Sequence, residues 1–465
     1  MTTTQTPTQT HSRRLAEFAS ALRPADLPDT VRQDAIWRLL DTIGVALVGS
    51  AMDYAQPIQE VFTETGGRAE ATVLGGGQRL PAASAGFVNA AYAHGPDFDD
   101  THSVAMVHIG CLAVPSALAM AERSGATGAE MLTALVAGAE VGLRVGAAAP
   151  HRFHMRGLHA TGVVGPFTSA VTAGKLLDLD ADRMSNGIGL AGSQAAGLLQ
   201  GLHDGSWVKR LHPGWAVQGG VTAALLAERG YLGPPQVFEG GWALYAVLLH
   251  GDSRPVDYDV LTGDLGTRWL LPETTYKPYS NGAWNHSAMD GVAAIMAAES
   301  LTYKDIARVD AIVPPECIPV VCEPREAKIH PVTPYHMKFS LPYSVAILAV
   351  LGHAGVDDYT PEVHANPDIA DLASRVYCQA DPDMAPNRFP AKVLLETRDG
   401  RHLSYDVPAQ RGGPGNPFSP DDHRTKFMSN ASPIIGPAQA ANLMNTIEGS
   451  WESESVHDLM RLTVK

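Results

Sequence analysis

A helical period of apolar residues, running from about residue 11 to residue 265, constrains the fold of this chain more than any other feature. The stretch 31–49 shows it clearly, with apolar side chains three and four positions apart at Ile36, Leu39, Leu40, Ile43 and Leu47. Two further stretches, 160–174 and 186–202, contain no charged residue. Since helices without a polar face are buried on most sides, we expect both stretches to form central helices.

The pattern changes near residue 268. Residues 391–408 read as two alternating strands flanking Asp399-Gly400, a strong hairpin signal. Between residue 268 and this hairpin lies one clear helix, FSLPYSVAILAVLG, and helical sequence returns from about residue 423. We therefore predict a mainly α protein, with a large all-helical domain (1–268 and 412–465) and a smaller α+β lid domain (269–411).

Charge and cysteine usage narrow the class of protein. The formal net charge of the 465 residues is −15 and no Lys/Arg run stands out, which argues against nucleic acid and anionic membrane as partners. The N-terminal MTTTQTPTQT lacks the features of a signal peptide, and no window is apolar enough to span a membrane. The four cysteines form no CxxC pair, so we expect reduced thiols in a cytoplasmic protein.

Titratable residues are concentrated in HGPDFDDTHSVAMVH, residues 94–108, which we call the acidic–histidine segment. It contains three carboxylates and three imidazoles: Asp97, Asp99, Asp100, His94, His102 and His108. Three interpretations are open: a metal site, a metal-free acid/base site, or a polar connector between two helices with capping aspartates. Because a carboxylate beside an imidazole fixes its tautomer and raises its pKa, the density of such groups favours the acid/base interpretation.

Two other clusters contribute cations. SWVKRLHPGWA brings together Lys209, Arg210 and His212 before a helix that we expect to open at about Trp215. It is either a solvated basic loop or a cradle for a di- or tricarboxylate. In TTYKPYSNGAWNH, Lys277 lies in a break before His286 and either is solvated or faces a cleft between domains.

His159 and Tyr343 are candidates of a weaker kind. His159 precedes the uncharged stretch 160–174, where a single histidine is more often a core or capping residue. Tyr343 lies in the predicted helix of the lid domain, where packing is the ordinary role.

The combination of these motifs resembles the MmgE/PrpD family, which includes 2-methylcitrate dehydratases, cis-aconitate decarboxylases and iminodisuccinate epimerases. The resemblance extends over nearly the whole chain and is carried by DFDDTHSVAMVH, GLHATGVVGPFTSAVTAGKLLDLD, WVKRLHPGWAVQGG, YKPYSNGAWNH and FSLPYSVAILAV. It implies a helical domain with an α+β lid, a homodimer, and no metal or organic cofactor. The sequence departs from many relatives at Ile109 and Cys111 after His108, and in the segment after Lys277.

The resemblance also implies roles for individual residues. Asp97 and Thr101 belong to the active-site loop, His108 is the acid/base imidazole, and His159 lines the same cleft. Lys209 and Lys277 bind substrate carboxylates or assist proton transfer, and Tyr343 reaches in from the lid. Together these give a catalytic set of Asp97, His108, His159, Lys209, Lys277 and Tyr343. The residues expected to bind substrate are Thr101, His102, Arg210, His212 and His286.

The chemistry shared by such a site is proton transfer at a carbon next to a carboxylate. We expect a lyase acting on a small polycarboxylate such as 2-methylcitrate or cis-aconitate, by dehydration or decarboxylation. An epimerase of a dicarboxylate such as iminodisuccinate would use the same groups. Other classes remain open: a metal-dependent hydrolase built on the 97–108 cluster, a non-catalytic binding protein, or an enzyme with a Schiff base at Lys277.

Overall fold

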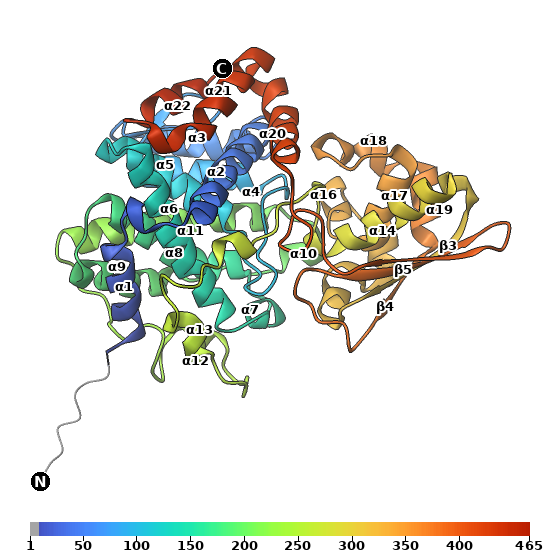
Figure 1. Cartoon of the computed structure of the whole chain (residues 1–465), viewed down its shortest axis with the longest axis horizontal. Helices are drawn as coiled ribbons and strands as arrows, with labels where there is room; N and C mark the ends of the chain where they lie inside the picture. The colour runs from blue at the N-terminus through green and yellow to red at the C-terminus, as the bar shows by residue number, and fades with distance from the viewer. Residues whose placement is uncertain (1–8) are drawn as a thin grey trace, which may run out of the picture.

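The computed structural model describes residues 9–465 and places them in two lobes (Figure 1). The polar N-terminal residues 1–8, on which the expectation of no signal peptide partly rests, lie outside the described residues. We call the larger body the helical lobe. Its helices are α1 (His11–Ala21), α2 (Asp29–Gly49), α3 (Ala55–Thr65), α4 (Ala82–His94), α5 (Gly110–Ser124), α6 (Gly128–Ala147), α7 (Arg152–Met155), α8 (Ala160–Leu176), α9 (Ala181–Ala191), α10 (Gly201–Asp204), α11 (Val208–Glu228), α12 (Leu244–Leu248), α13 (Tyr258–Thr262), α20 (Pro420–Ile435), α21 (Pro437–Glu448) and α22 (His457–Leu462).

The smaller body, which we call the α+β lobe, contains the remaining elements. They are α14 (Ala283–Glu299), β3 (Ile306–Val313), α15 (Arg325–Ile329), α16 (Pro334–Met337), α17 (Leu341–Leu351), α18 (Pro361–His364), α19 (Pro367–Ser374), β4 (Val376–Ala380), β5 (Ala391–Thr397) and β6 (His402–Val407). The strand order is β4-β3-β5-β6, with β3 and β4 parallel and the other pairs antiparallel. Helices α14, α17 and α19 lie on one side of this sheet (Figure 1).

The expected fold class is confirmed, with the predicted hairpin at β5–β6 and the predicted lid helix at α17. The C-terminal helices return to the helical lobe, where α20 packs along α2. One difference is a short ribbon, β1 (Ala71–Thr72) with β2 (Arg79–Leu80), in the part expected to be entirely helical. The exact domain boundaries near 268 and 412 stay a prediction.

The stretch 160–174 forms the buried helix α8, as predicted. Helix α6 packs closely on it through glycines. A Cβ added at Gly138 would collide with the Thr172 hydroxyl, and one added at Gly142 with the Thr168 hydroxyl. Only glycine therefore allows this approach of the two backbones, which holds the start of α8, and His159 before it, in the centre of the lobe.

The prediction of a second central helix over 186–202 is wrong. Helix α9 ends at Ala191, and the chain continues as an irregular segment in which Leu198 is exposed. Gly197 has φ +128°, a conformation that no helix contains and that residues with a side chain rarely adopt. Lack of charge here reflects a glycine-rich connector rather than burial.

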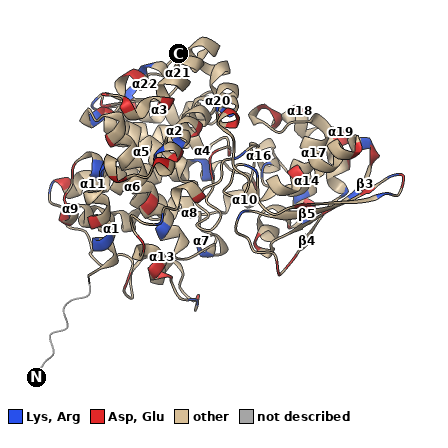
Figure 2. Ribbon diagram, in the orientation of Figure 1, with Lys and Arg blue, Asp and Glu red and all other residues tan. Residues whose placement is uncertain are grey.

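Charges are dispersed over both lobes. In Figure 2, the Lys and Arg positions (blue) and the Asp and Glu positions (red) are both scattered over the two lobes. In the described part of the chain, no helix is both long enough and apolar enough to cross a bilayer.

Candidate active site

The acidic–histidine segment is held between the two lobes by backbone pairing. The Thr101 N–H donates to the Thr275 carbonyl at 2.9 Å, and the Thr275 N–H donates back to Thr101 at 3.0 Å. Asp100 anchors the same segment by accepting from buried Arg38 of α2 at 2.8 Å and from the Gly110 N–H that opens α5. This pairing brings Lys277, two residues beyond Thr275, to Asp97.

Asp97 is the centre of the site. Its carboxylate accepts from Lys277 Nζ at 2.5 Å and from Lys209 Nζ at 3.2 Å, and Lys277 also donates to the Asp97 carbonyl at 3.0 Å. Burial would raise the Asp97 pKa, but the two ammonium groups outweigh it and hold that pKa well below its usual range. Asp97 has φ +55°, a conformation that its short polar side chain tolerates and that these contacts stabilise.

His108 is poised as a proton acceptor. Its Nδ1 lies 2.7 Å from the Asp100 carbonyl, which can only accept, so Nδ1 carries the hydrogen and Nε2 keeps its lone pair. The Thr101 hydroxyl lies 3.2 Å from the same Nδ1. Burial, together with Lys209 and Lys277, lowers the His108 pKa well below its ordinary value despite the charge of Asp99. His108 is therefore neutral at neutral pH, as a general base requires.

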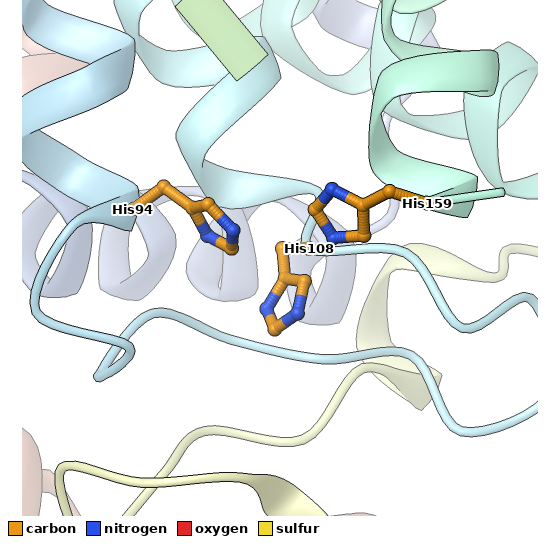
Figure 3. Close-up of side chains that lie close together, drawn as sticks. All are labelled: His94, His108 and His159. Carbon is orange, nitrogen blue, oxygen red and sulfur yellow. The ribbon is translucent and has the colours of Figure 1, made fainter. Parts of the chain in front are cut away.

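His94 and His159 complete a cluster of three imidazoles (Figure 3). His94, the last residue of α4, donates from Nδ1 to Asp99 at 2.7 Å, and its Nε2 lies 3.0 Å from Lys209 Nζ. His159, which precedes α8, has its Nδ1 3.0 Å from the His212 Nδ1, while its buried Nε2 has no hydrogen-bond partner in the described chain. Burial lowers the pKa of all three imidazoles, so all three are neutral at neutral pH.

The three imidazoles could in principle hold a metal ion, since His94, His108 and His159 each offer a ring nitrogen within 4.8 Å of the others. The surroundings do not fit a cation well. Lys209 donates into the Nε2 lone pair of His94, and Asp99 occupies its Nδ1. An ammonium group beside the ligand atom would repel a metal and compete for the lone pair that binds it.

The predicted cation cluster lies in a helix rather than in a loop before one. Helix α11 begins at Val208, not at about Trp215, so Lys209, Arg210 and His212 belong to its first turns. The Pro213-Gly214 pair, which normally breaks a helix, lies inside it. Consecutive helical residues point about 100° apart, so Lys209 reaches Asp97 while Arg210 faces Tyr335 and Tyr54.

Three residues predicted for the site have their side chains engaged elsewhere. His102 accepts from the Ala105 N–H and lies among Arg38, Arg268 and His151. His286 is close enough to Lys277 and Asp97 to sense their charge, but its Nδ1 pairs with Gln410 and its Nε2 with the Asn281 carbonyl. Tyr343 donates to the His364 carbonyl at 2.8 Å, within the α+β lobe.

Four residues near the centre were missing from the predicted set: His94, Asp99, Tyr335 and Lys338. The first two belong to the acidic–histidine segment, so its density of titratable groups already signalled them. Lys338 directly follows α16, is 1% exposed, and donates to the Pro96 carbonyl and to both oxygens of Ser280. It ties the α+β lobe to the residue before Asp97.

The imidazole and lysine cluster is closed to solvent, with His108 8% exposed and Lys277 0%. Beside it, between the lobes, lies a cavity of about 1280 Å³ whose lining includes Arg210, Tyr335 and Lys338. The site is thus a neutral base and two lysines on a shared carboxylate, next to this cavity but not part of its lining. Such an arrangement can move a proton next to a carboxylate and stabilise the charge that develops.

Comparison with known proteins agrees with this organisation. The family model for the MmgE/PrpD N-terminal domain matches residues 13–256, and the model for the MmgE/PrpD C-terminal domain matches residues 279–452. The chain is 27% identical over 480 residues to the cis-aconitate decarboxylase-like protein oryM of Aspergillus oryzae, covering 99% of this chain and 98% of that protein.

Two cis-aconitate decarboxylases are also similar. The protein from Aspergillus terreus is 30% identical over 287 residues, covering 60% of this chain and 58% of its own length. The protein from Homo sapiens is 26% identical over 466 residues, covering 96% and 93%. With its two family domains in order over most of its length, the chain belongs to the MmgE/PrpD family.

Proposed function

We propose that this protein is a cofactor-independent lyase that dehydrates or decarboxylates a small di- or tricarboxylate such as 2-methylcitrate or cis-aconitate. The similarity to cis-aconitate decarboxylases supports a lyase of this kind. The observation that carries the proposal is the pairing of a neutral His108, with Nε2 free to accept, and two lysines that share one carboxylate.

The chemistry follows from these groups. In a dehydration, His108 takes the proton from the carbon next to a carboxylate, and the hydroxyl group leaves as water after it receives a proton. In a decarboxylation, CO₂ leaves and the resulting carbanion receives a proton. In both, negative charge grows on a carboxylate, and Lys209 and Lys277 stabilise it. Preorganised groups of this type contribute roughly 3–4 kcal/mol each, and a general base contributes about 10²–10⁴-fold in rate.

His159 is the second proposed proton carrier. Its ring lies 5.9 Å from that of His108, centre to centre, and its Nε2 is unpartnered. Ring nitrogens of the two residues lie within 4.8 Å of each other, so both groups can act on the same part of a substrate, one accepting a proton and the other donating one. The same two groups would serve the deprotonation and reprotonation steps of an epimerase.

A Schiff base at Lys277 and a metal-dependent hydrolase are less well supported. The Lys277 amine is committed to Asp97 by two hydrogen bonds and is not a free nucleophile. Lys209 occupies the lone pair of His94 that a metal would need.

Proton NMR in D₂O tests the reaction. The purified protein is incubated with citrate, 2-methylcitrate, cis-aconitate, trans-aconitate and iminodisuccinate. New vinyl signals or loss of CO₂ would identify dehydration or decarboxylation, and deuterium uptake without net conversion would identify an epimerase. If no substrate changes or exchanges, while a tricarboxylate still raises the melting temperature, a binding protein is the better description.

We also propose a cytoplasmic homodimer. The thiols of Cys111, Cys317, Cys322 and Cys378 are all free, which fits a reducing compartment. One face of α11 exposes Val208, Trp215 and Leu226, and the chain beyond it exposes Tyr231 and Leu232. An apolar surface of this kind is typical of an interface. Trp215→Asp should convert the dimer into a monomer in light-scattering measurements, and a wild-type monomer would contradict the proposal.

A further inference from the structure

The cavity between the lobes is larger than the proposed substrates need. Its volume of about 1280 Å³ exceeds the roughly 300–1,000 Å³ of most small-molecule pockets. Four cationic side chains line it, and three have strong partners. Lys426 pairs with Asp41 at 2.7 Å, Arg411 with Asp422 at 2.5 Å, and Lys338 donates to three oxygens.

Arg210 differs from the other three. It is 4% exposed, yet its buried Nε and Nη1 make no hydrogen bond within the described chain. The carboxylate nearest to it is that of Asp53, 3.7 Å from Nη1, which is mostly solvent-exposed and already accepts from the Tyr54 N–H. A buried guanidinium with unmade hydrogen bonds is costly, and native proteins seldom keep one without a ligand or partner.

Aromatic rings fix the plane of this guanidinium. Its central carbon lies 4.0 Å from the ring centre of Tyr335, 4.5 Å from that of Tyr54 and 5.2 Å from that of Trp207. Cation–π contacts of this kind use the face of each ring and no N–H donor, so they leave the donors of the guanidinium for a ligand. A planar fork held this way matches a carboxylate, which accepts two parallel hydrogen bonds.

Tyr335 connects this position with the centre of the site. It lies against Arg210, and burial, with the negative charges of Asp97 and Asp99, raises the pKa of its hydroxyl although Arg210 opposes the rise. Arg210 and Tyr335 line the cavity, whereas Lys209, the residue before Arg210 in α11, lies in the buried cluster at Asp97.

We infer that Arg210 and Tyr335 form a second carboxylate-binding position, which holds a substrate carboxylate other than the one beside the reacting carbon. The inference rests on the proposed function and deepens it. The substrate carries one carboxylate more than the one that His108, Lys209 and Lys277 act on. A dicarboxylate is therefore preferred over the monocarboxylate that lacks its second acid group.

Calorimetry with two unreactive probes tests this position. Glutarate differs from butyrate by one carboxylate, and neither can lose water. The wild-type protein should bind glutarate at least about tenfold more tightly, the gain expected for one bidentate charge-assisted pair. Arg210→Gln should remove this preference and leave butyrate affinity within about twofold.

Two further variants keep the test informative if Arg210→Gln misfolds. Arg210→Lys keeps the charge but loses the fork, so it should lose most of the preference. Tyr335→Phe keeps the aromatic ring beside Arg210 but removes the hydroxyl, so this variant should lose part of the binding preference. Arg411→Gln is the matched control, because Arg411 lines the same cavity but is paired with Asp422, and it should retain the full preference.

The inference is overturned if the Arg210 variants weaken both probes equally, if they weaken neither, or if the wild type binds neither probe. Since binding needs no turnover, the two proposals can fail separately. A wild type that converts no polycarboxylate but shows the Arg210-dependent preference would refute the lyase and keep the carboxylate position. An active lyase whose preference does not depend on Arg210 would support the lyase and refute the carboxylate position.

Discussion

Asp97→Asn should make the protein bind anions more tightly while impairing turnover. In the structure the Asp97 carboxylate occupies both lysines, with oxygens 2.5 Å from Lys277 Nζ and 3.2 Å from Lys209 Nζ. A substrate carboxylate that contacts the same ammonium groups from the other side would lie roughly 5 Å from Asp97. At an effective dielectric constant of about 20, the repulsion between the two carboxylates is roughly 3 kcal/mol.

Asparagine removes this repulsion and leaves the backbone undisturbed, because it tolerates the positive φ of position 97 as well as aspartate does. Roughly 3 kcal/mol corresponds to about a hundredfold in affinity. Part of it is lost because two lysines without a shared counter-ion repel each other. We therefore expect propane-1,2,3-tricarboxylate to bind about 10- to 100-fold more tightly, with a steeper dependence on salt.

The same variant should be less stable without ligand. Removing one partner of a buried ion pair costs about 3–5 kcal/mol, and the bound anion should restore much of this loss in urea titrations. Glu140→Gln is the matched control. Glu140 is a buried acid that accepts from the Leu270 and Leu271 N–H groups, so its loss should lower stability without changing anion affinity. Unchanged or weaker binding by Asp97→Asn would refute the view that Asp97 and substrate compete for the lysines.

Other predictions concern individual groups. His108→Gln should lower kcat more than about a hundredfold, because it removes the proton acceptor; near-normal turnover would exclude His108 as the base. Lys209→Met should lower kcat/KM for a polycarboxylate about 10²–10³-fold, and an unchanged value would place the stabilising cation elsewhere. Burial lowers the pKa of His102 to about 3 and that of His212 to about 4, from 6.5. Below pH 6.5 these two histidines therefore bind protons in the unfolded chain but not in the folded chain. At pH 5 each of them should lower the free energy of unfolding by about 2 kcal/mol. Urea titrations at pH 7 and pH 5 measure this, and equal stabilities would contradict it. Dialysis against a chelator should leave turnover unchanged, whereas loss restored by Zn²⁺ would favour the metal-dependent hydrolase.

The sequence was informative wherever one local pattern decides the outcome. The Asp399-Gly400 turn joins β5 to β6, as its sequence indicates. The uncharged stretch 160–174 forms most of helix α8, and its residues are buried, as the lack of charge predicts. The same absence of charge was misleading at 186–202, where the helix ends at Ala191 and Gly197 adopts a conformation that no helix contains. Composition alone does not separate a buried helix from a glycine-rich connector.

The geometry of the site depends on contacts between distant segments, and sequence predicts these less well. Residue types pointed to Asp97, Lys209 and Lys277, but not to the sharing of one carboxylate by both lysines. The pairing of Thr101 with Thr275 creates that contact, and no local pattern predicts it. Tyr343 shows the opposite case, since a residue suggested by resemblance points to His364. Tyr335, in a four-residue helix without periodicity, has no local signal and contacts Arg210 instead.

The start of α11 explains how one short motif serves two positions. A loop before a helix that opens at about Trp215, as predicted from the sequence, would let Lys209 and Arg210 turn toward the same anion. A helix forces them about 100° apart, so Lys209 enters the buried cluster at Asp97 while Arg210 lies at the cavity against Tyr335. Exchanging the two residues would keep the charge and composition of the motif. It would also place a guanidinium where the ammonium donates to both Asp97 and His94. If catalysis depended only on total positive charge, Lys209→Arg combined with Arg210→Lys would remain active; the observed geometry predicts that it loses activity.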